Sequence, residues 1–222
     1  DGDGDPEYDD VDDLTIFITT LMLADYDTSG VIDFDDLHQF VASWERKDHT
    51  HELGPASGSV PSLTPIYDNE YDIEDMVSFL RMWNWSDGLA IPRLVSAPSS
   101  GKELDIFFES GDLIMQVPDF QSRISGIYVQ VQGENETEID FSNEPSSSFA
   151  LSLVREWEDL HVREWNLGKP KLDDEISTLF LGHVGYNMTD QLTCVVMYEI
   201  VAIDGTVLSR GTRTVKYVSL PE

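Results

Sequence analysis

Apolar residues recur with helical spacing in three segments of the N-terminal half of the chain. The segments 11–21, 34–44 and 73–83 align residue for residue, and each has apolar positions at i, i+3, i+4 and i+7. These positions are Leu14, Phe17, Ile18 and Leu21; Leu37, Phe40, Val41 and Trp44; and Met76, Phe79, Leu80 and Trp83. We therefore predict three amphipathic helices that are copies of one internal repeat.

The spacing changes to strict alternation in the C-terminal half, which predicts β-strands. Alternating runs lie at 103–110, 112–119, 124–132, 137–143, 148–157, 160–168, 175–184, 191–203, 206–211 and 213–220. Ser110-Gly111 and Asp204-Gly205 separate neighbouring runs, and an Asp-Gly pair in this position indicates a hairpin. Eight or nine short strands in about 120 residues indicate an antiparallel β-sandwich.

These patterns divide the chain into two domains, giving an α+β multidomain fold class. Residues 1–86 form a small all-α module of three loop-helix repeats, and residues 102–222 form the sandwich. The segment 87–101 between them is rich in Pro, Ser and Gly, which is typical of a linker. At 222 residues the chain can hold two domains with separate cores. We expect the linker to hold the two modules apart.

The segment 25–36, DYDTSGVIDFDD, has the ligand spacing of a twelve-residue calcium loop. Gly30 stands at position 6, where the chain must turn sharply, and alternate side chains then converge on one centre. Oxygen ligands at this spacing suit a hard divalent cation, and calcium is the expected ion. The predicted ligands are Asp25, Asp27, Ser29, Asp33 and Asp36, together with the main-chain carbonyl of Val31. Position 12 is Asp and not the usual Glu.

A second acidic loop opens the chain with the sequence DGDGDPEYDDVDD. It carries one extra residue around Pro6, so either Asp12 or Asp13 can close the site. Its predicted ligands are Asp1, Asp3, Asp5, Glu7, Asp9, Asp12 and Asp13. With both loops filled the chain binds two calcium ions. The alternative is that this acidic run is a solvated tail.

The third repeat lacks the first two ligands of the loop. It keeps Asp68, Asp72 and Asp75, but Thr64 and Ile66 stand where carboxylates are needed. We therefore predict that this repeat binds no ion and contributes packing.

Tandem loop-helix calcium units about 23 residues apart, without entering helices and with Asp at position 12, resemble a dockerin module over residues 1–86. The resemblance implies that calcium is structural and that the helix surfaces bind a β-sandwich partner called cohesin. Dockerins commonly carry small hydroxyl residues at positions 10 and 11 of the loop, whereas this chain has Phe34 and Asp35, so the partner does not carry over. The strand order of residues 102–222 resembles a cohesin-like or related bacterial surface sandwich.

Charge restricts the partners and the compartment. The formal net charge is −30, and residues 1–86 contribute −18 of it through 21 acidic against 3 basic side chains. A chain this acidic repels nucleic acid and anionic membranes, so we expect neither a nucleic-acid partner nor membrane insertion. Weak calcium sites fill outside cells, where comparable modules bind with dissociation constants of roughly 10⁻⁴ to 10⁻³ M. We therefore expect a secreted bacterial protein that is extracellular or at the cell surface.

No constellation of residues typical of an active site was found, so we expect no enzyme. The acidic clusters 156–159 and 173–175 lack a neighbouring nucleophile, and His49 and His51 lack further metal ligands at a defined spacing. Trp157 and Trp165 can either stack on sugars or fill the core. Cys194 lies in an apolar strand run, where a buried thiol is expected.

The pattern as a whole indicates a calcium-stabilised structural or assembly protein that mediates protein–protein association. One chain carries modules that resemble mutual partners, so the association is expected to run head-to-tail into a surface filament, or to involve another secreted β-sandwich protein. The alternatives are a carbohydrate-binding or adhesion module docked on another secreted protein, and the C-terminal fragment of a larger secreted enzyme.

Overall fold

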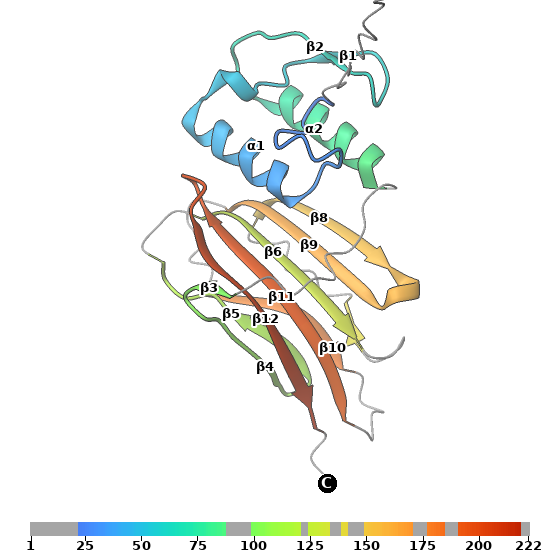
Figure 1. Ribbon diagram of the computed structural model, residues 1–222, viewed down its shortest axis with the longest axis vertical. Coiled ribbons are helices and arrows are strands. Elements are labelled where there is room, and N and C mark those ends of the chain that lie inside the picture. The colour runs from blue at the N-terminus through green and yellow to red at the C-terminus, as the bar shows by residue number, and fades with distance from the viewer. Residues whose placement is uncertain are drawn as a thin grey trace, which may run out of the picture.

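A computed structural model describes residues 22–87, 99–120, 124–133, 139–141, 149–170, 177–184 and 191–218 of the chain (Figure 1). The helices are α1 Phe34–Arg46 and α2 Ile73–Ser86, with short 3-10 turns at His49–His51 and Glu158–Leu160. The strands are β1 Ala56–Ser57, β2 Thr64–Pro65, β3 Ser100–Gly101, β4 Asp105–Glu109, β5 Asp112–Gln116, β6 Ile124–Gly133, β7 Ile139–Asp140, β8 Phe149–Trp157, β9 Val162–Pro170, β10 Thr178–Val184, β11 Leu192–Ala202 and β12 Val207–Tyr217.

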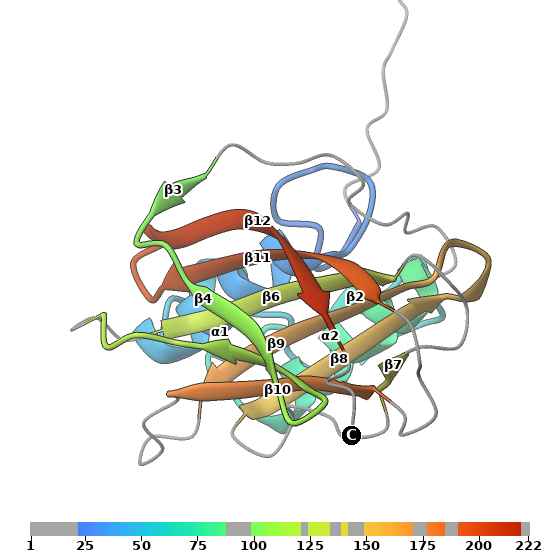
Figure 2. The same cartoon turned by 90° about the horizontal axis from the view of Figure 1, so that it is seen from below.

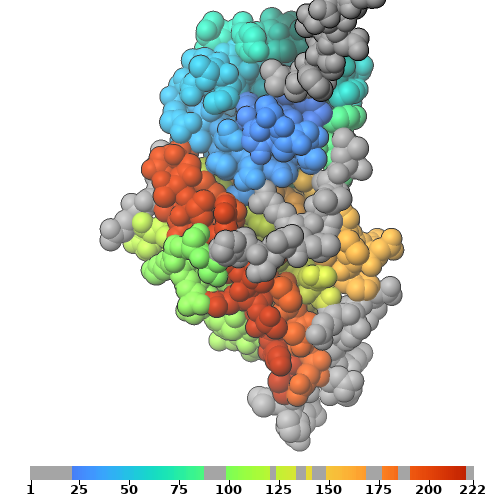
Figure 3. Space-filling view, in the orientation of Figure 1, coloured from blue at the N-terminus to red at the C-terminus, as the bar shows by residue number. Residues whose placement is uncertain are grey.

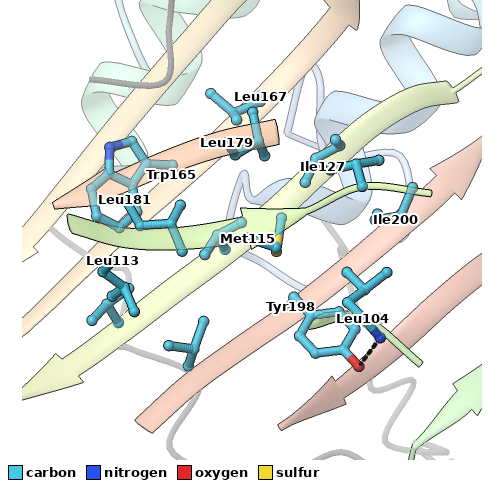
Figure 4. Close-up of a cluster of buried hydrophobic side chains, with 14 of the residues drawn as sticks. Leu104, Leu113, Met115, Ile127, Trp165, Leu167, Leu179, Leu181, Tyr198 and Ile200 are labelled. Atoms are coloured by element: carbon cyan, nitrogen blue, oxygen red, sulfur yellow. Dashed lines mark hydrogen bonds between the residues drawn. The ribbon is translucent and has the colours of Figure 1, made fainter. Parts of the chain in front are cut away.

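Two antiparallel sheets face each other and form a β-sandwich (Figure 2). One sheet has the strand order β4-β5-β10-β7, and the other has the order β3-β12-β11-β6-β9-β8. Their facing side chains form one apolar core in which Trp165 and Met115 are fully buried (Figure 4). The hydroxyl of Tyr198 reaches the edge of this core and accepts a hydrogen bond from the Leu104 N–H at 3.4 Å. The predicted β-sandwich is confirmed.

Strands β4 to β12 overlap the alternating runs, but β1, β2 and β3 lie outside them. The module predicted to be all-α contains the short β1–β2 pair, and the end of the predicted linker pairs with β12 as β3, because backbone pairing of two residues leaves no alternating pattern. One further difference concerns the last two runs. The two runs 206–211 and 213–220 form a single strand, β12, and do not break at Gly211. Gly211 pairs across the sheet with Tyr198, and a Cβ at this glycine would lie 2.7 Å from the Tyr198 hydroxyl oxygen. The glycine therefore makes room for a tyrosine on the neighbouring strand and does not end the strand.

Both described helices begin with the same reciprocal cap. The Asp33 carboxylate accepts from the first turn of α1 while the Asp36 carboxylate accepts from the Asp33 N–H, and Asp72 and Asp75 repeat this arrangement on α2. Such capping boxes satisfy backbone donors that the helix leaves unpaired. Two of the three predicted helices, 34–44 and 73–83, are therefore confirmed, each with its start at the expected residue. The predicted helix 11–21 lies outside the described residues.

The helices form a third layer that covers the outer face of the six-stranded sheet (Figures 1 and 3). The apolar cluster of this layer includes Tyr128, Leu151 and Val201 from the sheet itself. At the far end of α1, the Arg46 guanidinium donates to the Ile203 carbonyl at 3.1 Å. The expectation that the linker holds the two modules apart is wrong, because the helical layer and the sheet share a buried apolar interface.

A pair of glycines in the sheet makes this contact close. Gly126 on β6 and Gly168 on β9 are direct cross-strand partners. A Cβ at Gly126 would lie 3.0 Å from the Phe34 ring, and one at Gly168 would lie 3.1 Å from a Val41 methyl. Because neither glycine has a side chain, α1 packs closely against the sheet at this point. We call this pair the Gly126–Gly168 seat.

Candidate metal centre

The loop before α1 brings three of the predicted calcium ligands together. Carboxylate oxygens of Asp25, Asp27 and Asp36 all lie within 4.8 Å of one another. Asp36 is fully buried, Asp25 is half-buried and Asp27 is exposed. Figure 3 shows this part of the chain, coloured blue, at the surface of the helical layer. An ion can therefore reach the cluster from solvent while one of its ligands is anchored in the protein.

Hydrogen bonds within the loop hold these carboxylates in place. Asp25 accepts from the Ser29 and Gly30 N–H groups, each at 3.0 Å, and Asp27 accepts from the Ser29 N–H at 2.9 Å. Gly30 has a φ of +88°, a conformation that favours glycine, as predicted for the sharp turn at position 6. The Ser29 hydroxyl donates to the Val31 carbonyl at 2.9 Å. Asp33 also lies in the loop, and its carboxylate accepts from the Asp35 N–H at 2.9 Å.

Among the described loop residues, Asp36 has a strongly raised carboxyl pKa. Burial raises its pKa to about 8, although N–H groups donated by Asp33 and Tyr26 oppose the rise. Its two oxygens accept these bonds at 2.9 Å from Asp33 and 2.6 Å from Tyr26. The pKa of Asp25 is also raised, chiefly by burial. Three carboxylates in so small a volume repel one another, and a bound cation would offset that repulsion.

The donor set suits calcium. All the candidate ligands are oxygens, which hard cations prefer. The structure brings together the carboxylates of Asp25, Asp27 and Asp36, and the Asp33 carboxylate is not in this group. A carboxylate oxygen that accepts one N–H retains a second lone pair, so the internal hydrogen bonds leave coordinating capacity on Asp25, Asp27 and Asp36. The predicted ligands of the first loop, residues 1–13, lie outside the described residues.

The third repeat reproduces the loop with different partners. The carboxylate of Glu52, which is 3 % exposed, accepts from the Asp68 and Asn69 N–H groups at 2.6 and 2.9 Å. These are the positions equivalent to Ser29 and Gly30, whose N–H groups bind Asp25 in the second repeat. Glu52 comes from the insertion between the helices and thus takes the role of the missing carboxylate at Thr64.

Asp75, the third-repeat equivalent of Asp36, also has a different environment. Its fully buried carboxylate accepts from the Leu53 and Gly54 N–H groups at 2.9 and 2.7 Å. The insertion therefore supplies both a carboxylate and two N–H donors to this loop. Sequence reasoning missed these roles, although the third loop's lack of its first two ligands indicated that something else must complete it. That this loop binds no ion stays a prediction.

The second and third repeats pack as a pair with an approximate two-fold relationship. Phe40 and Phe79 hold equivalent positions, and their rings stack on each other at 4.9 Å with an interplanar angle of 20°. Equivalent residues that contact each other are the mark of a self-complementary interface. The loop 25–36 and the third loop thus belong to one packed unit, residues 22–87.

Several other candidate residues have structural positions. Cys194 is buried in the sandwich core, as predicted, and burial raises the pKa of its thiol to about 12. Trp165 is fully buried and cannot stack on a sugar. His49 contacts Glu52 at 3.1 Å and His51 contacts the Ser43 hydroxyl at 2.8 Å, so the two rings bind different partners. In the part of the chain that the structure describes, no helix is long and apolar enough to cross a membrane.

The chain was compared with family models, curated protein sequences and solved structures. No family model matches it, and no curated protein sequence matches it. A solved structure with partial likeness is the collagen-binding domain from a Staphylococcus aureus adhesin, with a TM-score of 0.33 and 8 % sequence identity over 51 % of this chain and 95 % of that domain. The β-sandwich fold of this protein is established by its own two sheets.

Proposed function

We propose that the protein is an extracellular, calcium-stabilised binding module with a structural or adhesive role. The observation that carries the proposal is the loop 25–36, in which the twelve-residue ligand spacing and the convergence of Asp25, Asp27 and Asp36 agree. Calcium at this loop would fix the start of α1, which is the helix that sits on the sheet. The ion then serves the fold and needs no chemical reaction.

Thermal unfolding with and without calcium tests this proposal. An ion present at about a hundred times its dissociation constant adds roughly 2.7 kcal/mol per site. We expect excess EGTA to lower the thermal midpoint of the helical signal at 222 nm, and Asp25→Ala to reduce the difference between the two conditions. Asp68→Ala, in the third loop, is the matched control and should keep the full difference. Identical curves for the wild-type chain in calcium and in EGTA would refute the calcium site.

An exposed apolar face on the helical layer supports the binding role. Ile73 and Val77 lie four residues apart on α2, and their side chains are 61 % and 48 % exposed. The preceding loop adds Ile66 and Tyr67, which are 56 % and 63 % exposed. Large apolar side chains that are exposed on one face of a helix can contribute to a protein-binding surface. The partner we propose is another protein, either a second copy of this chain or a different secreted protein.

Light scattering over a wide concentration range in millimolar calcium separates these partners. Head-to-tail association predicts a mass that grows with protein concentration and that falls to the monomer in the double variant Ile73→Lys with Val77→Lys. A monomer at every concentration would exclude self-association and leave docking on a different protein. Association that persists unchanged in the double variant would show that this face is not the contact.

A further inference from the structure

Arg155 on β8 connects the sheet directly to the calcium loop. Its guanidinium donates to the Ile32 carbonyl at 2.7 Å, and Ile32 is position 8 of the loop, between the Val31 carbonyl and Asp33. The Ile32 N–H donates to the Ser86 hydroxyl at 2.7 Å. Both main-chain groups of this residue are thus fixed from outside the loop, one by the sheet and one by α2.

The surroundings of Arg155 hold its guanidinium in one place. The side chain is 3 % exposed and pairs with Asp87 at 2.8 Å and with the Glu164 carboxylate at 3.7 Å. Its guanidinium carbon also lies 4.1 Å from the centre of the Trp83 ring on α2. A buried cation held by two carboxylates, a ring and a carbonyl loses much when any one partner moves away. The residue therefore acts as a clamp between β8, β9, α2 and the loop.

The first turns of α1, which overlap the end of the same loop, pack against the glycine pair. Phe34 follows the ligand Asp33 directly and is packed over Gly126, while Leu37 follows Asp36 and is packed over Gly168. The residues next to two predicted ligands thus contact the sheet. The same short segment therefore carries both the predicted ligands and contacts that dock the helical layer.

We propose that calcium binding at the loop 25–36 and docking of the helical layer on the β-sandwich are thermodynamically coupled, with Arg155 and the Gly126–Gly168 seat as the coupling elements. This inference rests on the proposed function. Because coupling is reciprocal, complete loss of docking must lower calcium affinity by the same factor by which loss of calcium weakens docking, and a variant that undocks the layer in part must show part of that factor. Calcium would then act as a switch that sets whether the outer face of the six-stranded sheet is covered.

Calcium affinities of two unrelated docking variants, measured by calorimetry, test the coupling. Arg155→Gln removes the clamp, and Gly168→Val fills the seat without changing charge. We expect each to raise the dissociation constant of one calcium site by about five-fold or more, the range usual for coupled sites. Removing a positive charge near a cation site would by itself strengthen calcium binding, so a weaker affinity in Arg155→Gln has the opposite sign to a simple charge effect.

Two matched controls complete the design. Arg213→Gln removes an equal charge on β12, where Arg213 pairs with Glu103, and Ala150→Ile adds three carbon atoms, as Gly168→Val does, at an exposed position of β8. Both should keep the wild-type dissociation constant. Near-UV circular dichroism in saturating calcium checks that each variant folds, and if one does not fold the other decides the test.

The outcomes separate the two proposals. If the wild-type chain binds no calcium, the proposed function fails. If the wild-type chain binds calcium and both docking variants bind it with the same dissociation constant, the coupling fails and the calcium site stands. Hydrogen exchange gives the reciprocal measurement: amides of β8 and β9 should exchange more slowly in calcium than in EGTA in the wild-type chain, and this difference should shrink in Arg155→Gln.

Discussion

Asp36 and Asp75 occupy the same position in two repeats, are both fully buried, and are stabilised by different partners. Asp36 accepts N–H groups from Tyr26 and Asp33 and also faces Asp25 and Asp27, an arrangement that favours a cation. Asp75 accepts N–H groups from Leu53 and Gly54, which come from the insertion between the helices. Both buried carboxylates need such donors, because burying a charge without partners is costly. The repeat thus carries one loop suited to an ion and one completed by protein groups.

The first prediction concerns Glu52 at the third loop. Glu52→Ala removes the acceptor of the Asp68 and Asn69 N–H groups, and we expect a loss of about 2 kcal/mol or more in the free energy of unfolding. Because no ion is proposed for this loop, the loss should be the same in calcium and in EGTA. Urea denaturation in the two buffers measures it. Glu70→Ala, at an exposed neighbouring position, should change stability by less than about 0.5 kcal/mol.

At the scale of elements, sequence periodicity was sufficient to locate most individual helices and strands. Alternation located the strands and helical spacing located α1 and α2, since both periods follow directly from which face of an element is buried. The continuity of β12 was missed because Gly211 makes room for Tyr198 on β11, and this contact between strands is not visible in the sequence. Docking of the helices was missed for the same reason. Gly126 and Gly168 are far apart in the sequence and become neighbours only when β6 and β9 pair. The convergence of Asp25, Asp27 and Asp36 was predictable because their spacing is local, and their role as calcium ligands stays a prediction. The roles of Glu52 and Arg155 depend on tertiary contacts.

The β4–β5 hairpin offers an element-scale prediction. Ser110 and Gly111 have φ values of 53° and 90°, so both central residues of the turn are left-handed. Asn tolerates this conformation better than Ser and is preferred before Gly in such turns. Ser110→Asn should therefore raise the free energy of unfolding by about 0.5 kcal/mol.

Gly111→Ala is the opposing change at the same turn. It should lower the free energy of unfolding by about 1 kcal/mol or more, because alanine is strained at this positive φ and its Cβ would lie 3.2 Å from the His183 ring. Urea denaturation of both variants measures the two effects. A destabilising Ser110→Asn would show that the turn conformation differs from the one described.

At the scale of the whole molecule, the helical layer and the sandwich behave as one packed body and not as two modules on a linker. The apolar cluster between them joins α1 and α2 to Tyr128, Leu151 and Val201, and buried apolar area is the dominant favourable term in folding. The net charge of −30 opposes compaction through self-repulsion. If calcium binds as proposed, it would reduce this charge in the acidic N-terminal part of the chain, and its effect would extend beyond the loop 25–36.

Hydrogen exchange tests this shared stability. In saturating calcium we expect the amides of α1 to be protected to nearly the same free energy as those of β6, because opening one exposes the interface with the other. Mass spectrometry of peptides spanning 34–46 and 124–133 gives the comparison. If α1 exchanges orders of magnitude faster than β6 with calcium bound, the helical layer opens independently and the single-body description is wrong.

Calorimetric titration with calcium tests the central claim most directly. The wild-type chain should bind two ions, and Asp25→Ala should bind one fewer, because Asp25 is the position-1 ligand of the loop 25–36. Asp72→Ala, at the N-cap of α2 in the third repeat, should keep the wild-type stoichiometry. A wild-type titration without saturable heat, or an Asp25→Ala variant that binds as many ions as the wild-type chain, would contradict the assignment of this loop as a calcium site.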